Sequence, residues 1–278
     1  MKNTFRKTLL STLIVPFVIG AQSASAAQIT DWGYSVNNVF SNWNASSGNA
    51  SDIDNAADDR TLSWGEVSSQ YPAQSSISIT NAAASNGLIT NGSSVMGGVF
   101  THTNNIIDAS DPALTSFNLS TMLTLTPVAP FAGDSFSAPA LNFSGLFRET
   151  PNNGNCVAAS VSNCDDIFTV GNISDLGSMA TDDGGFEFAS SFTIDDYDYT
   201  VFLELINLAV LDNESCAAAN AANGCVGILT QENAINNFDT RFRITATPAS
   251  VPEPGTLALL GMGLAGLGMS RRKKAAKA

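Results

Sequence analysis

The fold class is decided by residues 186–205, which read FEFASSFTIDDYDYTVFLEL. On both sides of Asp195-Asp196 most apolar residues recur at every second position. A period of two is the pattern of an antiparallel strand with one buried face and one solvated face. Aspartate is common in tight turns because its side chain hydrogen-bonds the nearby backbone. These residues therefore predict two strands joined by a hairpin turn.

The same alternation recurs in three further segments, at residues 117–125, 141–148 and 238–246. Only the alanine-rich pieces near Ala56 and Ala82, and the chain around the cysteines, hint at short helices. Many strands, turns rich in glycine and asparagine, and little helical periodicity are typical of a β-sandwich or jelly roll. We therefore predict an all-β body, formed by a single antiparallel β-sandwich or jelly-roll-like domain.

The carboxyl-terminal end of the chain consists of a short proline motif, an apolar run and a basic cap. The motif reads VPEPG from residue 251, and the apolar run covers residues 256–269. This run of about 14 residues is shorter than the roughly 20 that cross a bilayer comfortably. Lysine and arginine stay on the cytoplasmic face, so the cap places the body on the opposite side of the membrane. The residues of the motif and the cap are Val251, Pro252, Glu253, Pro254, Arg271, Arg272, Lys273 and Lys274.

This tail resembles the PEP-CTERM sorting signal. The resemblance implies that an exosortase, a membrane protease similar to transpeptidases, recognises the tail and processes the chain near Pro252-Glu253-Pro254. The two prolines hold the backbone extended, which is the conformation that a protease cleft accepts. We therefore expect the carboxyl-terminal helix to enter the membrane transiently, with an ordinary permanent tail anchor as the alternative.

The amino-terminal end has the three parts of a secretory signal peptide. Lys2, Arg6 and Lys7 form a positive region, residues 9–19 form an apolar core, and Ala24-Ser25-Ala26 is a small-residue cleavage site. We predict cleavage after Ala26. The chain then divides into a signal peptide (1–26), a β-sandwich body (27–250) and a sorting signal (251–278).

The body is strongly acidic. Eight of the 12 Lys and Arg residues lie in the two terminal segments, so the body keeps four arginines against 24 of the 25 carboxylates, a net charge of −20. Such a surface repels nucleic acid and anionic lipid, which excludes nucleic-acid binding.

Four cysteines fall into two local pairs, Cys156 with Cys164 and Cys216 with Cys225. An even number of cysteines in an exported chain indicates disulfides, and each local pair encloses a short loop rich in turn residues. Each disulfide would stabilise the fold by roughly 2–3 kcal/mol through loop entropy. The alternative, a zinc site built from all four cysteines, lacks the usual paired C-x-x-C spacing.

Several short motifs of the body occur together with these cysteines. They are RTLSWG at residues 60–65, FTHTN at 100–104, FRETPN at 147–152 and CDDIF at 164–168. Together they resemble the THxN family of PEP-CTERM proteins, named for a Thr-His-any-Asn motif, here Thr101, His102 and Asn104. The resemblance implies export, anchoring and a β-rich body, and it brings no enzymatic activity.

Candidate catalytic residues are few. His102 is the only histidine, and it could act as a general base or a metal ligand, but we favour a structural role at a strand end, with Thr101 and Asn104 hydrogen-bonding the turn backbone. Glu149, Glu187 and Glu204 are candidates for a glycosidase carboxylate pair. The chain contains no G-x-S-x-G nucleophile motif.

Candidate ligand-binding residues are also weakly marked. Asp195, Asp196 and Asp198 are carboxylates that suit Ca²⁺, although none of the acidic clusters follows the D-x-[DN]-x-[DN]-G pattern, and a hairpin turn explains this one equally well. The three tryptophans could form a platform for sugar stacking. They are Trp32, Trp43 and Trp64.

These observations lead to one functional prediction and two alternatives. We predict an exported, non-enzymatic protein, held at the inner membrane by its tail and then released to the cell envelope or an exopolysaccharide (biofilm) matrix as a structural or interaction component. No cofactor is required, although Ca²⁺ is an option. The alternatives are a carbohydrate-binding module, with or without Ca²⁺, and a secreted hydrolase.

Overall fold

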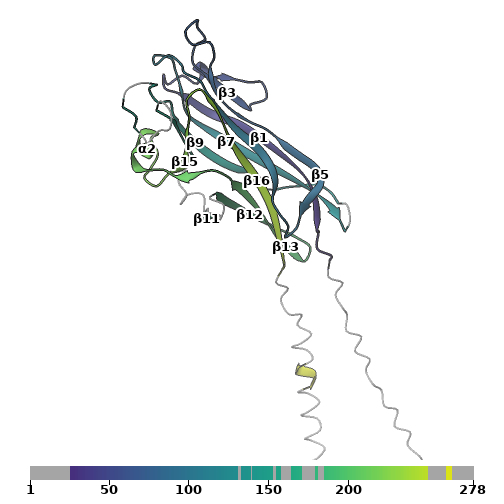
Figure 1. Cartoon of the computed structure of the whole chain (residues 1–278). Helices are drawn as coiled ribbons and strands as arrows, with labels where there is room; N and C mark the ends of the chain where they lie inside the picture. The colour runs from purple at the N-terminus through teal and green to yellow at the C-terminus, as the bar shows by residue number, and fades with distance from the viewer. Residues whose placement is uncertain are drawn as a thin grey trace, which may run out of the picture.

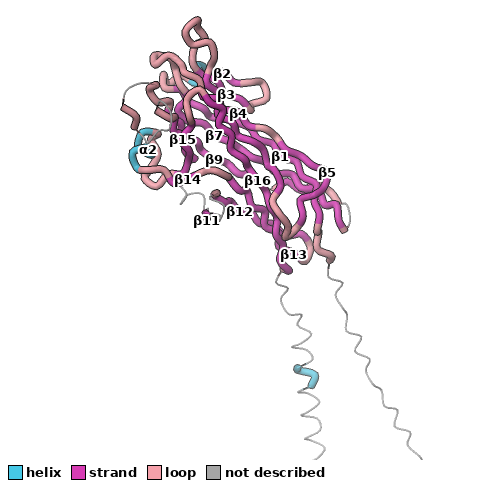
Figure 2. The backbone as a smooth tube through the Cα atoms, in the orientation of Figure 1, coloured by secondary structure: helices cyan, strands magenta, loops and turns pink. Residues whose placement is uncertain are grey.

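The computed structural model describes residues 26–130, 133–138, 140–152, 155–157, 164–170, 179–180, 185–249 and 261–264. Within these residues the body consists of two eight-stranded sheets that face each other across one hydrophobic core (Figures 1 and 2). All ladders between the named strands are antiparallel. The prediction of an antiparallel β-sandwich is confirmed.

The strands of the first sheet lie in the order β14 (Ala209–Val210), β15 (Val226–Thr230), β10 (Asp166–Val170), β9 (Leu141–Arg148), β7 (Leu114–Ala129), β1 (Asp31–Ala45) and β5 (Ala82–Ile89), with β8 (Phe136–Ser137) paired to β7. The strands of the second sheet lie in the order β11 (Met179–Ala180), β12 (Phe186–Ile194), β13 (Tyr197–Leu205), β16 (Ala234–Pro248), β6 (Val95–Asn104), β4 (Ser75–Ile79), β3 (Thr61–Trp64) and β2 (Asp54–Asn55). Two short helices, η1 (Ala50–Asp52) and α2 (Asn213–Ala218), lie in the connections.

The hairpin predicted from residues 186–205 is formed by β12 and β13. Nine residue pairs join the two strands, and Asp195 and Asp196 form the turn between them. Asp195 has a φ of 50°, a left-handed conformation that aspartate adopts more readily than most side chains. Along β13 the alternate residues Tyr199, Val201 and Leu203 are buried in the core. The period-two pattern therefore marks a strand with one buried face, as the sequence predicts.

Aromatic side chains join the two sheets. Trp32 of β1 meets Tyr199 of β13 edge to face, with ring centroids 5.2 Å apart, and Phe40 of β1 meets Phe100 of β6 in the same way at 6.1 Å. Edge-to-face contacts bring the positive ring edge to the negative ring face, which adds to the stabilisation from burial alone. The long β1 thus anchors the first sheet onto the second along much of its length.

The sandwich has two distinct ends. At one end, which we call the tail end, the Ala26 amide donates to Asp196 Oδ2 at 2.8 Å and the Ala249 amide donates to the Asp196 carbonyl at 2.7 Å. Both ends of the body therefore lie together there. Strand β16 begins at the opposite end, the far end, where Ala234 pairs with Asn104. At about 3.3 Å per residue, its 15 residues separate the two ends by about 45 Å.

Three sequence predictions have other outcomes. The hint of a helix near Ala82 is wrong, because this segment forms β5, which pairs with β1. The signal peptide up to residue 25 and the sorting-signal residues of the motif and cap lie outside the described residues. Residues 261–264 form one exposed helical turn. Among the described residues, no helix has both the length and the apolar character needed to span a bilayer.

Candidate functional site

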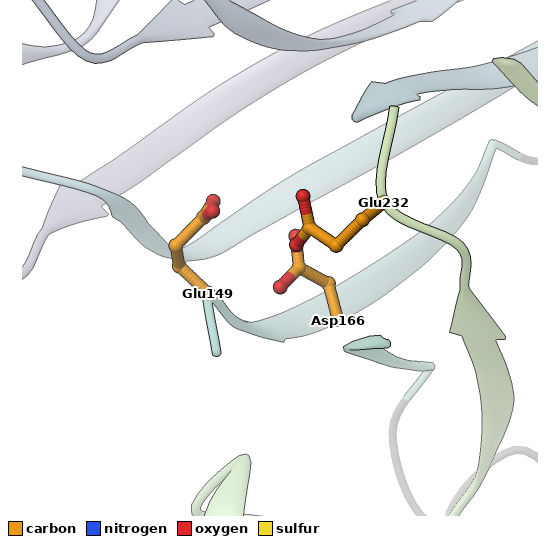
Figure 3. A group of neighbouring side chains, drawn as sticks. All are labelled: Glu149, Asp166 and Glu232. Carbon is orange, nitrogen blue, oxygen red and sulfur yellow. The ribbon is translucent and has the colours of Figure 1, made fainter. Parts of the chain in front are cut away.

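Three carboxylates converge at the far end of the sandwich. One ligand oxygen each from Glu149, Asp166 and Glu232 lies within 4.8 Å of the others. Figure 3 shows the three side chains reaching toward one another from separate chain segments. We call Glu149, Asp166 and Glu232 the acidic cluster.

The sheet order explains why residues so far apart in sequence meet here. Glu149 directly follows β9 and Asp166 begins β10, and these two strands are antiparallel neighbours. Asp166 lies opposite Thr230, the last residue of the next strand, β15, and Glu232 follows two residues later. The cluster therefore lies at the edge of the first sheet where β9 and β15 end and β10 begins.

The cluster is largely withdrawn from solvent. Asp166 is 0% exposed and Glu232 is 8% exposed. Trp64 donates its indole N–H to Glu149 Oε2 at 2.8 Å, and the Thr150 amide donates to Asp166 Oδ1 at 2.7 Å. These donors orient two of the carboxylates without supplying a positive charge.

Glu232 is held by side-chain amides. With its amide nitrogen turned toward Glu232, Asn152 donates to both carboxylate oxygens, at 2.8 and 2.9 Å. The amide of Asn104 also hydrogen-bonds Glu232, which favours the charged form of that carboxylate. Glu232 is thus fixed in place beside Asp166.

Burial changes the acidity of the whole cluster. It raises the pKa of Glu149 to about 8, and the nearby charge of Glu232 adds to the increase. Burial also raises the pKa of Glu232 to about 7, with a contribution from Asp165. The pKa of Asp166 rises well above its usual value for the same reason, reinforced by Glu149. Three carboxylates at this separation are stable only as protonated acids or beside a cation.

Several polar atoms at this site have no partner in the described part of the protein. They are Glu149 Oε1, Asp166 Oδ2, Asn104 Oδ1 and His102 Nε2. Buried polar atoms are normally satisfied, so a group of them at one place requires an explanation. In the same described part, neither Glu149 nor Asp166 forms an ion pair with an arginine.

The Thr-His-any-Asn motif borders the cluster from the second sheet. His102 Nδ1 lies 2.9 Å from Thr230 Oγ1, and that hydroxyl donates to the Asp166 carbonyl at 3.3 Å, so we assign the imidazole proton to Nδ1. Asn104 Nδ2 donates to the Thr230 carbonyl at 3.2 Å. The His102 ring stacks on Trp64 with centroids 5.8 Å apart. His102 and Asn104 therefore bind the first sheet to the second.

The charge state of His102 follows from its burial. The side chain is 1% exposed, and desolvation lowers the pKa of His102 to about 3. The imidazole is thus neutral near neutral pH. Thr101 points away from this site, where its hydroxyl donates to Asn237 Oδ1 at 2.7 Å rather than to the turn backbone.

The three predicted glycosidase carboxylates are not all brought together. Glu187 and Glu204 lie opposite each other in β12 and β13, and both contact Arg243. Glu149 instead joins Asp166 and Glu232.

The predicted tryptophan platform is wrong. Trp32 and Trp64 are both 0% exposed, and Trp43 is half-buried with its indole N–H donating to the Ala50 carbonyl at 3.2 Å. Trp32 and Trp64 therefore belong to the core. Their buried indole N–H groups are satisfied inside the fold, by Thr90 Oγ1 for Trp32 and by Glu149 for Trp64.

The aspartates proposed from sequence as calcium ligands serve the hairpin turn at the tail end. The Asp198 carboxylate accepts from Thr193 Oγ1 at 2.6 Å, and Asp196 accepts from Ala26. Of the residues that the structure describes, the only group of three metal-binding side chains within 4.8 Å of one another is the acidic cluster.

Both predicted disulfides are confirmed. Cys156 is bonded to Cys164, with Cα atoms 4.8 Å apart, and Cys216 is bonded to Cys225, with Cα atoms 5.7 Å apart. The zinc alternative is therefore wrong, since all four sulfurs are used. The first disulfide lies in the connection between Glu149 and Asp166, next to the acidic cluster.

Comparison with known proteins bears on the tail. Residues 250–273 match the family model of the PEP-CTERM protein-sorting motif. No curated protein matches the chain. This motif supports export by membrane-associated sorting to the cell surface. The match supports a PEP-CTERM protein, targeted to an exosortase-like processing enzyme.

Proposed function

We propose that this protein is a structural or interaction component of the cell surface or extracellular matrix, released there by an exosortase, and that it is not an enzyme. The observation that carries the proposal is the sorting motif at residues 250–273, attached to a stable β-sandwich body. The likeness of Thr101, His102 and Asn104 to the THxN motif supports the same assignment within the PEP-CTERM proteins.

The state of the chemically capable side chains supports a non-enzymatic role. A general base or a nucleophile must reach a substrate. His102 is 1% exposed, and its Nδ1 is engaged with Thr230. Glu187 and Glu204 both form ion pairs with Arg243. These three candidate catalytic residues are thus engaged in contacts within the fold, which supports the proposal.

The position of the tail supports presentation at a surface. The body ends at Ala249, beside Asp196 at the tail end, and the far end lies about 45 Å away along β16. While the tail is held at the membrane, the far end with its loops is directed outward. Exopolysaccharide is the partner class that we propose for this outward end.

A polar pocket at the far end is the observation that favours carbohydrate binding as a second function. Its lining includes Asp52, Asp54, Glu66 and Gln74. Carboxylates and amides of this kind can hydrogen-bond sugar hydroxyls. Glycan-array binding of the protein, with Gln74→Ala as the variant, tests this function. Loss of a measured glycan signal in the variant is expected, and absence of any signal with or without EDTA would remove the carbohydrate proposal.

Replacement of Pro252, Glu253 and Pro254 by alanine tests the sorting role. We expect the variant to accumulate unprocessed in the inner membrane, because alanines no longer hold the backbone extended at the motif. The measurement is immunoblotting of membrane, envelope and culture fractions. Pro72→Ala, at an exposed loop proline of the body, is the matched control and should be processed normally. Normal release of the triple variant would contradict the sorting role.

A further inference from the structure

We propose that the acidic cluster of Glu149, Asp166 and Glu232 binds one divalent cation of the calcium class at the far end of the sandwich. This inference goes beyond the proposed function and does not depend on it. A cation there would be structural, since the ligands lie inside the fold rather than in an open cleft.

The spacing of the ligands fits a single ion. Calcium binds oxygen ligands at 2.3–2.6 Å, so two ligands on opposite sides of the ion are separated by about 4.6–5.2 Å, and all others by less. The ligand oxygens of Glu149, Asp166 and Glu232 lie within 4.8 Å of one another. One ion can therefore contact all three carboxylates with little movement of the chain.

A buried side-chain amide adjoins the cluster. Asn104 is 0% exposed and comes from β6 of the second sheet, not from the strands that carry the carboxylates. Its Nδ2 donates to the Thr230 carbonyl, and its Oδ1 has no partner among the described residues. Asn104 also contacts Glu232, which places the amide at the edge of the cluster. Side-chain amide oxygens are common calcium ligands.

The lone pairs needed for coordination are available. Glu149 Oε2 accepts from Trp64 and Asp166 Oδ1 accepts from Thr150, which leaves Glu149 Oε1 and Asp166 Oδ2 unpartnered within the described chain. Each of these carboxylates thus has one oxygen held by a donor and one oxygen without a donor in the described chain. This division is typical of metal ligands whose orientation is fixed by a second hydrogen bond.

The alternative is that protons, not a cation, neutralise the cluster. A proton serves at most two carboxyl oxygens, whereas the ligand oxygens of all three carboxylates lie within 4.8 Å of one another, and Glu149 Oε1 and Asp166 Oδ2 lack a donor among the described residues. A cation satisfies both oxygens at once. It would also join Glu149 to Asp166 across the base of the loop that contains the Cys156–Cys164 disulfide, and so hold that loop against the sheet.

Terbium luminescence of the full-length, disulfide-bonded protein tests the site directly. After EDTA treatment and removal of the chelator, added Tb³⁺ should emit on tryptophan excitation, because Trp64 donates to the ligand Glu149. We expect saturation at one equivalent, and competition by Ca²⁺ at concentrations at which Mg²⁺ is ineffective. Ca²⁺ should also raise the temperature of unfolding. No sensitised emission together with no thermal shift would overturn the proposal, as would a response to Mg²⁺ alone.

Two variants locate the ion. Asp166→Asn and Glu232→Gln keep the size of each side chain, and each should weaken Ca²⁺ binding at least tenfold and remove most of the thermal shift. Neither should lower the unfolding temperature in EDTA, because each removes a buried negative charge; this separates loss of binding from misfolding. Asp195→Asn is the matched control, since asparagine suits the left-handed backbone of that turn. Unchanged binding in both cluster variants, or loss of binding in the control, would refute the assignment.

Discussion

Two groups of carboxylates in this protein differ in how their charge is neutralised. In the second sheet, Glu187 and Glu204 lie opposite each other, and Arg243 of the adjacent strand β16 forms ion pairs with both. In the first sheet, Glu149 and Asp166 have no arginine partner among the described residues. The sequence thus encodes an internal cation for one group, and the other must obtain its neutrality from protons or a bound ion.

The Arg243 network shows how one arginine stabilises two neighbouring carboxylates in this fold. The guanidinium Nε donates to Glu204 Oε1 at 3.1 Å, and the guanidinium carbon lies 3.7 Å from the centroid of the Phe202 ring. The Arg243 side chain is 29% exposed, and those of Glu187 and Glu204 are 12% and 14% exposed. Planar guanidinium groups suit such sites because they bind two carboxylates and stack on an aromatic face at the same time.

The largest effect is expected for Arg243→Met, which removes the cation and keeps most of the volume. Glu187 and Glu204 would then be left facing each other with little solvent, and breaking a largely buried ion pair costs about 3 kcal/mol of unfolding free energy. Urea denaturation in the presence of Ca²⁺ measures this loss.

Arg60→Met is the matched control for that experiment. Arg60 pairs with Asp58 at the surface, where the two side chains are 33% and 50% exposed, so its loss should change stability far less than the loss of Arg243. If Arg243→Met is as mild as Arg60→Met, the two carboxylates do not need an internal cation, and the contrast between the sheets disappears.

A smaller effect is expected from pH when chelator is present. Burial raises the pKa of Glu149 from 4.5 to about 8, so above pH 4.5 the folded protein holds a proton that the unfolded chain has released. Stability then falls as pH rises, and the loss is complete above the folded pKa. Between pH 6.5 and 8 Glu149 alone should lower the unfolding free energy by on the order of 2 kcal/mol. The raised pKa of Glu232, about 7, acts in the same direction.

The single histidine limits the pH range in which this fall in unfolding free energy can be measured. The pKa of His102 is lowered by burial from 6.5 to about 3, so below pH 6.5 the unfolded chain binds a proton that the folded protein does not, and stability falls as pH decreases. Between pH 6.5 and 8 the unfolded histidine releases its remaining half proton, which changes stability by only about 0.4 kcal/mol and in the opposite direction. Denaturation at pH 6.5 and 8 therefore reports mainly on the carboxylates. We expect the unfolding free energy to fall between these two pH values in EDTA, and to fall much less in Ca²⁺. An unfolding free energy that does not change with pH in EDTA would show that the pKa values of the cluster are not raised.

The sequence predicts the sheets well because strand periodicity is a local property. Alternation at residues 186–205 is sufficient to identify β12 and β13, and the short spacing of each cysteine pair is sufficient to favour its pairing. The acidic cluster is a product of long-range topology. Asp166 is visible in the sequence only as part of an acidic pair, and Glu232 is indistinguishable from an ordinary polar residue beside a turn.

His102 and Asn104 are the signal that could have led to the cluster. Both are polar residues at alternate positions of one strand, and alternate positions share a face. That face is the buried one, since His102 is 1% exposed and Asn104 is 0% exposed. Two polar side chains on a buried face require polar partners from the opposite sheet, and Thr230 and Glu232 are those partners. The identity of the partners depends on how the sheets pack, which local patterns do not contain.

The smallest effect is expected for Trp64→Phe, which keeps a buried ring and removes the indole donor of Glu149. Loss of one hydrogen bond to a charged or partly charged group costs about 1–2 kcal/mol, and the Trp64–His102 stacking is weakened as well. The change should also raise the pKa of Glu149 further, because this hydrogen bond lowers it. The fall in unfolding free energy that is measured in EDTA should therefore occur at higher pH.

Trp43→Phe is the control, because the Trp43 indole donates to the Ala50 carbonyl at the surface. This variant should leave the pH dependence of the unfolding free energy unchanged. If both variants show the same dependence of unfolding free energy on pH, Trp64 does not control the acidity of the cluster. The carboxylates of the first sheet would then lack the fixed partner that Arg243 provides for Glu187 and Glu204 in the second sheet.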